Sequence, residues 1–379
     1  MRLTLLLLPI LAFGGWTDLS DNIPGPSDIG LSDVHFIGQE GWISASWPRD
    51  SGVVFHTTDG GETFEVQHTR YGVLSLDMLD TETGFGCGYE GRVYHTTHGG
   101  DTWPAIGSAG GTTVSIDFPP GSDTGYCCGL NGNIHRVTPT GVTRMTSNVN
   151  GDLYSISFSV SASEGWVCGG NVIRHYADGE WRADQDYPTG NYNALQMLGN
   201  EVGWAAGDKV IRTTDGQNWT RQTTPDTTRG MNAVHFLDSS TGWIVGERGL
   251  VLETANGGSD WSIVAAGMTS NFLRSVFAVD TNEVYVVGND KTFLKYTGGP
   301  GLEEKAEGGR MKAEPVFPTI LRGPDLTKLD CRVLDIQGRD VTGATEILGP
   351  GVYFLKDEGG RLKDEPGSAA AVRKVIVQR

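Results

Sequence analysis

The sequence predicts an all-β fold, a seven-bladed β-propeller followed by a small immunoglobulin-like β-sandwich, and three observations support this prediction. An aromatic residue flanked by glycines recurs with a period of about 40 residues, which is the spacing of propeller blades. Short runs of β-branched and aromatic residues, separated by turn formers, fill each period. A segment rich in Gly, Glu, Lys and Pro then separates the repeats from a C-terminal stretch of further strand-like runs.

Each repeat is expected to form one four-stranded antiparallel blade. The anchors are aromatic residues of the second strand: Trp42, Phe85, Tyr126, Trp166, Trp204, Trp243 and Tyr285. A single sheet cannot bury both of its apolar faces, so the blades must pack face to face around an axis. The last repeat lacks its fourth strand, whereas Gly14-Gly15-Trp16 has the sequence of that strand. We therefore expect the N-terminal segment to complete the last blade and to leave no open sheet edge.

Four regions follow from this pattern. Residues 1–14 combine a basic residue, a leucine-rich run and a small-residue site, which is typical of a secretory signal peptide. Residues 15–300 form the predicted propeller, residues 301–312 a linker, and residues 313–379 the predicted sandwich. No later apolar run is long enough to span a membrane. The sequence thus predicts a monomer that is secreted or held at the outer cell surface.

The charge and the cysteines exclude several kinds of partner. The net charge is −17, and acidic and basic residues balance after residue 300, so the propeller carries the imbalance. An acidic propeller argues against nucleic acid, heparin-like polymers and anionic lipid as partners. Cys87, Cys128 and Cys168 share a repeat position that small apolar residues fill elsewhere, which indicates buried free thiols. No metal-type spacing is present, and we expect no cofactor.

Residues on the first strand of the repeat are the candidate ligand-binding residues. The candidates occupy equivalent positions in their repeats, on the strand nearest the predicted channel: His35, Asp77, Asp117, Gln196 and His235. Ser157 and Phe277 hold the same position in the other two repeats. Two interpretations stay open, hydrogen bonding between blades and a binding site at the channel mouth. His56, His95 and His175 form a second equivalent set, but such positions diverge around a ring, so we predict no metal site there. No residue is assigned a catalytic role.

The turns between third and fourth strands carry the Asp-box pattern Ser/Thr-x-Asp-x-Gly-x-Thr-Trp, as in residues 57–64. The Asx side chain of such a turn accepts backbone N–H groups, so the role predicted for these residues is structural. The residues concerned are Asp59, Asp178, Asp215 and Asn256.

The glycine-flanked strand and the Asp-box turn together resemble the BNR/Asp-box propellers, and most closely the Ycf48/Hcf136-like family of photosystem II assembly factors. This resemblance covers residues 14–300. It implies an assembly chaperone, and photosynthetic members of the family use an arginine-rich surface. Sialidases share the Asp box, which keeps a secreted glycoside hydrolase (sialidase-like or other) with an acidic pair at the channel mouth as another alternative.

The C-terminal region resembles a different family. Residues 333–341, 351–355 and 373–379 follow the order of the type A sorting domain of type IX secretion systems. The resemblance implies that residues 313–379 are recognised by the secretion machinery. On this basis the sequence predicts a secreted or cell-surface, non-catalytic binding scaffold for an unknown protein or an extracellular polymer. The alternatives are the glycoside hydrolase and the assembly factor.

Overall fold

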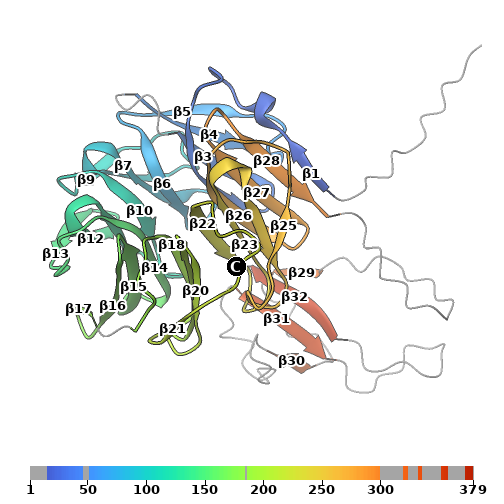
Figure 1. Ribbon diagram of the computed structural model, residues 1–379. Coiled ribbons are helices and arrows are strands. Elements are labelled where there is room, and N and C mark those ends of the chain that lie inside the picture. Colours follow the sequence, from blue (N-terminus) through green and yellow to red (C-terminus); the bar gives the residue numbers. More distant parts are fainter. Residues whose placement is uncertain are drawn as a thin grey trace, which may run out of the picture. The chain divides into compact units, whose positions relative to one another are not determined.

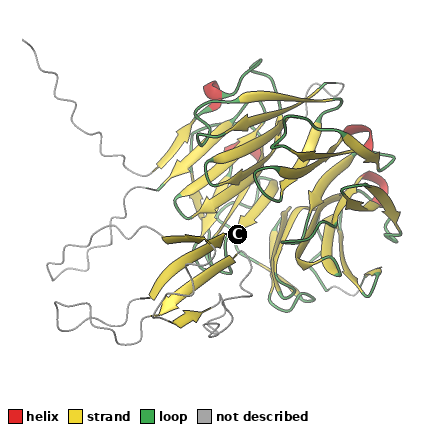
Figure 2. Cartoon of the chain, turned by 180° about the vertical axis from the view of Figure 1, so that it is seen from behind, coloured by secondary structure: helices red, strands yellow, loops and turns green. Residues whose placement is uncertain are grey.

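The computed structural model describes residues 15–45, 51–183 and 186–298, together with strands β29 (Thr319–Arg322), β30 (Arg332–Leu334), β31 (Gly351–Lys356) and β32 (Val372–Gln378). The predicted signal peptide and linker lie outside these residues. Strand is the dominant element, and the helices are single 3₁₀ turns (Figure 2). No helix in the described ranges is long and apolar enough to cross a membrane.

Seven four-stranded antiparallel sheets form the propeller, which confirms the predicted seven blades (Figure 1). The first three blades are β2 (Leu31–Ile37) to β5 (Glu65–Thr69), β6 (Val73–Met78) to β9 (Ala105–Ser108), and β10 (Thr113–Asp117) to β13 (Gly141–Met145). The next three are β14 (Leu153–Ser161) to β17 (Glu180–Arg182), β18 (Tyr192–Leu198) to β21 (Trp219–Arg221), and β22 (Met231–Phe236) to β25 (Ser262–Val264). Neighbouring inner strands contact one another all the way round, and β26 contacts β2.

The middle strands of these blades carry the anchors and the residues that stack on them. The second strands are β3 (Glu40–Ala45), β7 (Thr83–Gly88), β11 (Gly125–Gly129), β15 (Glu164–Gly169), β19 (Val202–Gly207) and β23 (Gly242–Gly246). The third strands are β4 (Gly52–Thr57), β8 (Arg92–Thr97), β12 (Asn133–Thr138), β16 (Val172–Ala177), β20 (Val210–Thr213) and β24 (Val251–Thr254). Almost every second-strand residue is buried, as expected for a sheet packed on both faces.

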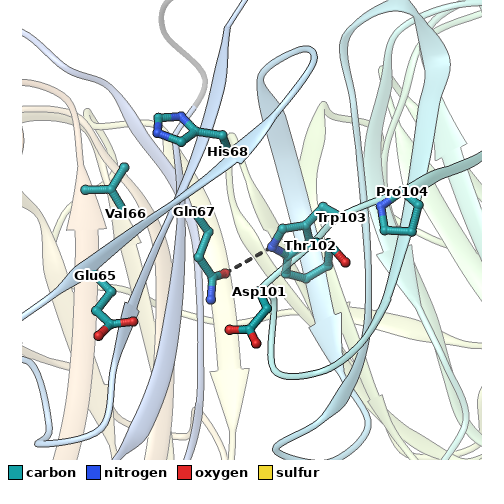
Figure 3. Close-up of a pocket in the computed structure, with 8 residues that line it drawn as sticks. All are labelled: Glu65, Val66, Gln67, His68, Asp101, Thr102, Trp103 and Pro104. Carbon is teal, nitrogen blue, oxygen red and sulfur yellow. Dashed lines mark hydrogen bonds between the residues drawn. The ribbon is translucent and has the colours of Figure 1, made fainter.

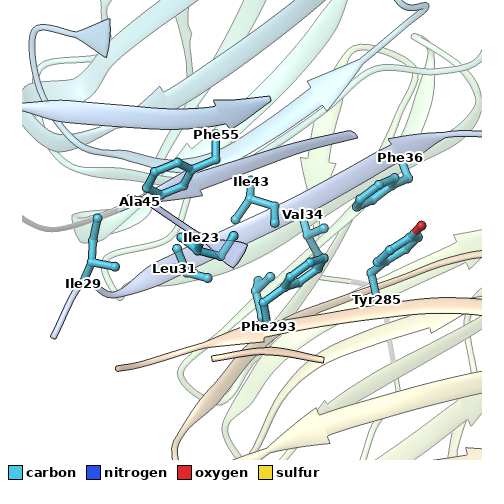
Figure 4. Packing of buried hydrophobic residues seen from close by; sticks show 11 residues of the cluster. Ile23, Ile29, Leu31, Val34, Phe36, Ile43, Ala45, Phe55, Tyr285 and Phe293 are labelled. Atoms are coloured by element: carbon cyan, nitrogen blue, oxygen red, sulfur yellow. The ribbon is translucent and has the colours of Figure 1, made fainter. Parts of the chain in front are cut away.

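The seventh blade joins the two ends of the propeller. Its strands are β26 (Leu273–Asp280), β27 (Glu283–Gly288), β28 (Phe293–Thr297) and, from the N-terminus, β1 (Gly15–Asp18). β1 pairs antiparallel with β28, placing Trp16 opposite Tyr296. The segment after β1 buries Ile23 and Ile29 in a cluster that also holds Tyr285 and Phe293 (Figure 4). The seam between the last and first blades is therefore closed by both hydrogen bonds and apolar packing.

An indole hydrogen bond links consecutive blades. The Nε1 atoms of Trp42, Trp166 and Trp204 donate to the carbonyl oxygens of Gly99, Gly216 and Gly257, at 2.7, 3.1 and 3.0 Å. Each acceptor lies in the Asp-box turn of the next blade. At the closing seam the Tyr285 hydroxyl lies 3.3 Å from Gly60 O, and its closer acceptor is Glu283 Oε1 at 2.6 Å.

Phe85 is the anchor with no donor atom, and the blade that follows it has the degenerate turn at residues 139–140. The donor is thus missing at the seam where the glycine acceptor is also missing. At this seam the choice of anchor matches the turn of the next blade.

The C-terminal strands form a sheet of their own, in the order β29-β32-β31-β30. β29 runs parallel to β32, and the other pairs are antiparallel. A sandwich needs a second sheet, and the described residues of this region supply one sheet. The immunoglobulin-like sandwich stays a prediction.

Candidate functional site

The predicted channel residues lie at one level of the ring. Each stands directly opposite the anchor of its own blade: His35 opposite Trp42, Asp77 opposite Phe85, Asp117 opposite Tyr126, Gln196 opposite Trp204 and His235 opposite Trp243. Ser157 and Phe277 hold the same position in the remaining blades. Because inner strands line the axis of a propeller, these side chains form a ring around the channel.

Most of this ring is engaged in hydrogen bonds between blades. Asp77 Oδ2 accepts the N–H of Phe118 at 2.8 Å, and Asp117 Oδ2 accepts the N–H of Phe158. Gln196 accepts the N–H of Phe236 through Oε1 and donates from Nε2 to the carbonyl of the same residue. These contacts agree with the interpretation that the ring residues form hydrogen bonds between blades. A ligand-binding role for the five candidates stays a prediction.

Burial pushes the ring's titratable groups toward their neutral forms. Burial raises the pKa of Asp117 to about 7, and burial together with Asp117 raises that of Asp77 well above its usual value. His35 and His235 lie on either side of Phe277, with ring centroids 4.6 and 4.8 Å from it. Burial lowers the pKa of His35 to about 3, with a smaller contribution from His235, and lowers that of His235 to about 4. His35 Nδ1 is 3.6 Å from Asp77 Oδ1, a contact that burial makes largely one of neutral groups.

The sequence interpretation missed Asp33, which lies two residues before the ring position. Asp33 Oδ2 accepts the N–H of Leu76 in the second blade, and Oδ1 accepts the hydroxyl of Ser275 in the seventh. Asp33 therefore ties three blades together at the closing seam. A signal was present, because Ser75, Ser115, Ser155 and Ser275 hold the same repeat position. Ser75 and Ser115 also accept an N–H from the next blade.

The third-strand histidines lie apart from one another, each in its own blade. His56, His95 and His175 stack on their anchors with ring centroids 5.1, 4.4 and 4.6 Å apart. His56 and His175 also place Nε2 3.0 Å from Glu40 Oε1 and Glu164 Oε1. In the described parts of the chain, no three His, Cys, Asp or Glu side chains are grouped as a metal site requires.

Three of the four predicted Asp-box residues hold their turns by accepting N–H groups. Asp59 Oδ1 accepts those of Glu62 and Thr63 at 3.0 and 2.9 Å, and Thr63 accounts for most of the lowering of the Asp59 pKa to about 2. Asp215 and Asn256 form the same kind of contact, with Asn218 and Asp260.

Asp178 belongs to a shortened box and behaves differently. It has a φ of 52° and pairs with Arg182 Nη2 at 2.8 Å instead of holding the turn. It is 81% exposed, so this ion pair contributes little to stability.

The two ends of the propeller differ in charge. The first strands of all blades run in the same direction along the propeller axis. The turns that join the first strand to the second, and the third strand to the fourth, therefore lie at the same end of the propeller. We call this end the Asp-box end. The loops between blades and between second and third strands gather at the other, the inter-blade end. Lys and Arg are absent from the described turns of the Asp-box end. The inter-blade end carries Arg70, Arg92, Lys209, Arg229, Arg248, Arg274 and Lys291.

Arginines and aromatic rings lie together on the inter-blade end. Tyr71 is contacted by the guanidinium groups of Arg70 and Arg92, which are 5.4 and 5.9 Å from the ring centroid. Arg248 is exposed, and Phe272 is 46% exposed. The arginines are scattered along the sequence, and the topology brings them to one end because they occur in two classes of loop. The sequence interpretation did not foresee this.

A groove lies on the outer rim of the first and second blades, with a volume of about 450 Å³ (Figure 3). β5 supplies Glu65, Val66 and His68, and the facing Asp-box turn supplies Asp101 and Pro104. Beside them, Trp103 Nε1 donates to Gln67 Oε1 at 3.0 Å. The deepest polar groups are thus already paired, which indicates a structural seam.

Residues 211–303 match the family "Photosynthesis system II assembly factor YCF48". The photosystem II assembly lipoprotein Ycf48 of Synechococcus sp. (strain CC9902) is 25% identical over 302 residues, covering 75% of this chain and 76% of the relative. The propeller of this chain is similar to that of the Ycf48 protein. A solved structure of YCF48 bound to a D1 peptide matches with a TM-score of 0.60 and 19% identity over 76% of this chain and 99% of that one.

Enzymes share the architecture as well. Virginiamycin B lyase from Staphylococcus aureus matches with a TM-score of 0.63 and 13% identity over 75% of this chain and 99% of the lyase. At this identity the likeness shows the fold alone.

The main functional prediction from the sequence, a secreted or cell-surface, non-catalytic binding scaffold, is wrong. The matching relatives are photosystem II assembly proteins, which favours the assembly-factor alternative. The C-terminal resemblance had led the prediction away from the propeller, which is the part of the chain that the relatives share.

Proposed function

We propose that this protein is an assembly factor of the Ycf48 type, which binds a segment of a client subunit while a membrane-protein complex is put together. The observation that carries the proposal is the similarity to a photosystem II assembly lipoprotein over three quarters of both chains. A structural relative described as bound to a D1 peptide supports peptide binding as the mode of action. A propeller suits this role because its rigid blades present preformed surfaces to a partner.

The inter-blade end is the surface that we assign to the client. Arg70 and Arg248 are exposed there, and a guanidinium forms paired hydrogen bonds with a carboxylate. Tyr71 and Phe272 add aromatic surface beside the charges. A client segment with acidic and apolar side chains would suit this combination.

The D1 peptide of the solved relative is the probe for a first test. We expect saturable binding in a fluorescence anisotropy titration, and an affinity reduced about tenfold or more when Arg70→Ala and Arg248→Ala are combined. Arg136→Ala is the matched control, because Arg136 is exposed at the Asp-box end. Absence of saturable binding, or equal loss with Arg136→Ala, would contradict the assignment.

A second proposal concerns transport. The motifs of residues 1–14 and 313–379 support export of the chain, with the C-terminal region acting as a transport signal. Intact-mass analysis of envelope and medium fractions from the native host tests it. We expect mature protein that lacks the first segment and is released from the second after transport. Full-length protein in the cytoplasm would rule out the proposal.

A further inference from the structure

An apolar collar surrounds the channel at the Asp-box end. The residue two positions after the ring position of each inner strand is apolar in six of the seven blades. We define the collar as these six residues and the nearby Val160: Ile37, Leu79, Pro119, Leu198, Leu237, Val279 and Val160. Leu79 is 38% exposed and Val160 is 55% exposed. Four others are partly buried between blades. Pro119 is buried. These positions lie at or just beyond the ends of the strands that line the channel, so the collar lies near its mouth.

Carboxylates are numerous at the same end of the propeller. The turns of the Asp-box end and the strand ends beside them carry Glu40, Asp59, Glu62, Asp80, Glu82, Asp101, Asp123, Glu164, Asp178, Glu180, Glu201, Asp215, Asp238, Asp260, Asp280 and Glu283. Few nearby cations balance them; Lys295 pairs with Glu283 at 3.1 Å and Arg182 with Asp178. Glu82 and Glu201 are exposed.

The arrangement has the form of a protein interface. Interfaces commonly place exposed apolar side chains at the centre and polar groups at the rim, and opposite charges across the rim guide association. The acidic rim here requires a basic partner, and the collar requires an apolar residue at the centre of that partner. The inter-blade end also carries exposed carboxylates, such as Asp28, Glu90 and Asp208, but there the Lys and Arg residues named above offset much of their charge. A client chosen for those arginines would not fit the acidic end equally well.

We infer that the Asp-box end is a second docking surface, which binds a protein segment carrying lysine or arginine residues around exposed apolar side chains. The propeller then holds two partners of opposite charge on its two ends. This inference goes beyond the proposed client site and does not depend on it, because the residues of the two surfaces are separate.

Three labelled short peptides form the probe set: alternating lysine and leucine, alternating lysine and serine, and alternating glutamate and leucine. Binding to the full chain is followed by fluorescence anisotropy at increasing salt. We expect the lysine–leucine peptide to bind best, the lysine–serine peptide to bind about tenfold or more weakly, and the glutamate–leucine peptide to bind least at this end. Affinity for the first peptide should fall as salt rises.

Two sets of variants separate charge from apolar contact. Glu82→Lys combined with Glu201→Lys should reduce lysine–leucine binding about tenfold, whereas Asp28→Lys, the same change at an exposed inter-blade position, should leave it unchanged. Leu79→Ser with Val160→Ser should abolish the preference for leucine over serine. Circular dichroism establishes that each variant is folded.

Two results would overturn the inference. One is equal binding of the lysine–leucine and lysine–serine peptides, which would mean attraction to net charge alone. The other is an equal loss with Asp28→Lys. D1-peptide binding in the same variants reports separately on the client site, since Glu82→Lys with Glu201→Lys should not affect it.

Discussion

Replacing Trp204 by Phe tests whether the indole hydrogen bond stabilises the ring. The Trp204 side chain is fully buried, stacks on Phe236 with centroids 3.5 Å apart, and donates to Gly257 O at 3.0 Å. Phenylalanine keeps the stacking but leaves the Gly257 carbonyl without this donor, which costs about 1–3 kcal/mol. The smaller ring leaves a cavity of about 40 Å³, which costs about 1 kcal/mol more. We expect a total of about 2–4 kcal/mol.

Urea unfolding followed by tryptophan fluorescence and circular dichroism measures this loss. Tyr285→Phe is the companion variant, because it removes, with almost no change in volume, the hydroxyl that donates to Glu283 Oε1 at 2.6 Å and lies 3.3 Å from Gly60 O. It should cost about 1–2 kcal/mol. A loss below about 0.5 kcal/mol for Trp204→Phe would refute the idea that this bond holds adjacent blades together.

Three further predictions concern the channel, the closure and the turns. Because the pKa of Asp117 is raised from 3.8 to about 7 in the folded protein, the free energy of unfolding should fall as pH rises from about 4 to about 7 and stay lower above that. Asp117→Asn should reduce this fall by an amount on the order of 1–2 kcal/mol, after discounting for channel water. An unchanged dependence of stability on pH in the variant would contradict this prediction. Removing residues up to Asp18 deletes β1 and exposes the edge of β28. Because an exposed strand edge can pair with another chain, the truncated protein should self-associate in size-exclusion chromatography with light scattering. A stable monomer would contradict the role of β1 in closing the ring. Asp59→Asn should melt within about 1 °C of the parent, because Asn256 serves in an equivalent turn, whereas Asp59→Ala should melt several degrees lower; equal melting temperatures would deny the turn bonds any effect.

Much of the propeller could be predicted from the sequence, because each blade repeats the same local pattern. The anchors gave the number of blades, and the same spacing put His35 opposite Trp42 and Asp117 opposite Tyr126. Such periodic features depend on short-range sequence, which one chain displays in full. The free cysteines also follow the pattern, and Cys87, Cys127, Cys128 and Cys168 are buried.

Contacts between blades were harder to predict. The partner of Asp77 is a backbone N–H of Phe118, and any residue type could supply such a group. Likewise, Arg70 and Arg248 share one end of the molecule only because of the direction in which each strand runs. The function could not follow from charge composition, since the net charge of −17 conceals an end on which arginines gather.

The indole bonds also give the ring a direction and constrain how it can grow. Each donor and its acceptor belong to different repeats, so a blade is completed by its successor in one rotational sense. A duplicated copy of the fifth blade would bring both a tryptophan donor and a glycine-bearing turn, and would fit before or after itself. The same copy placed directly ahead of the third blade would present an indole to a turn that lacks the glycine acceptor. An added blade would therefore keep its indole bonds next to the fifth blade and would lose one at the seam that follows Phe85.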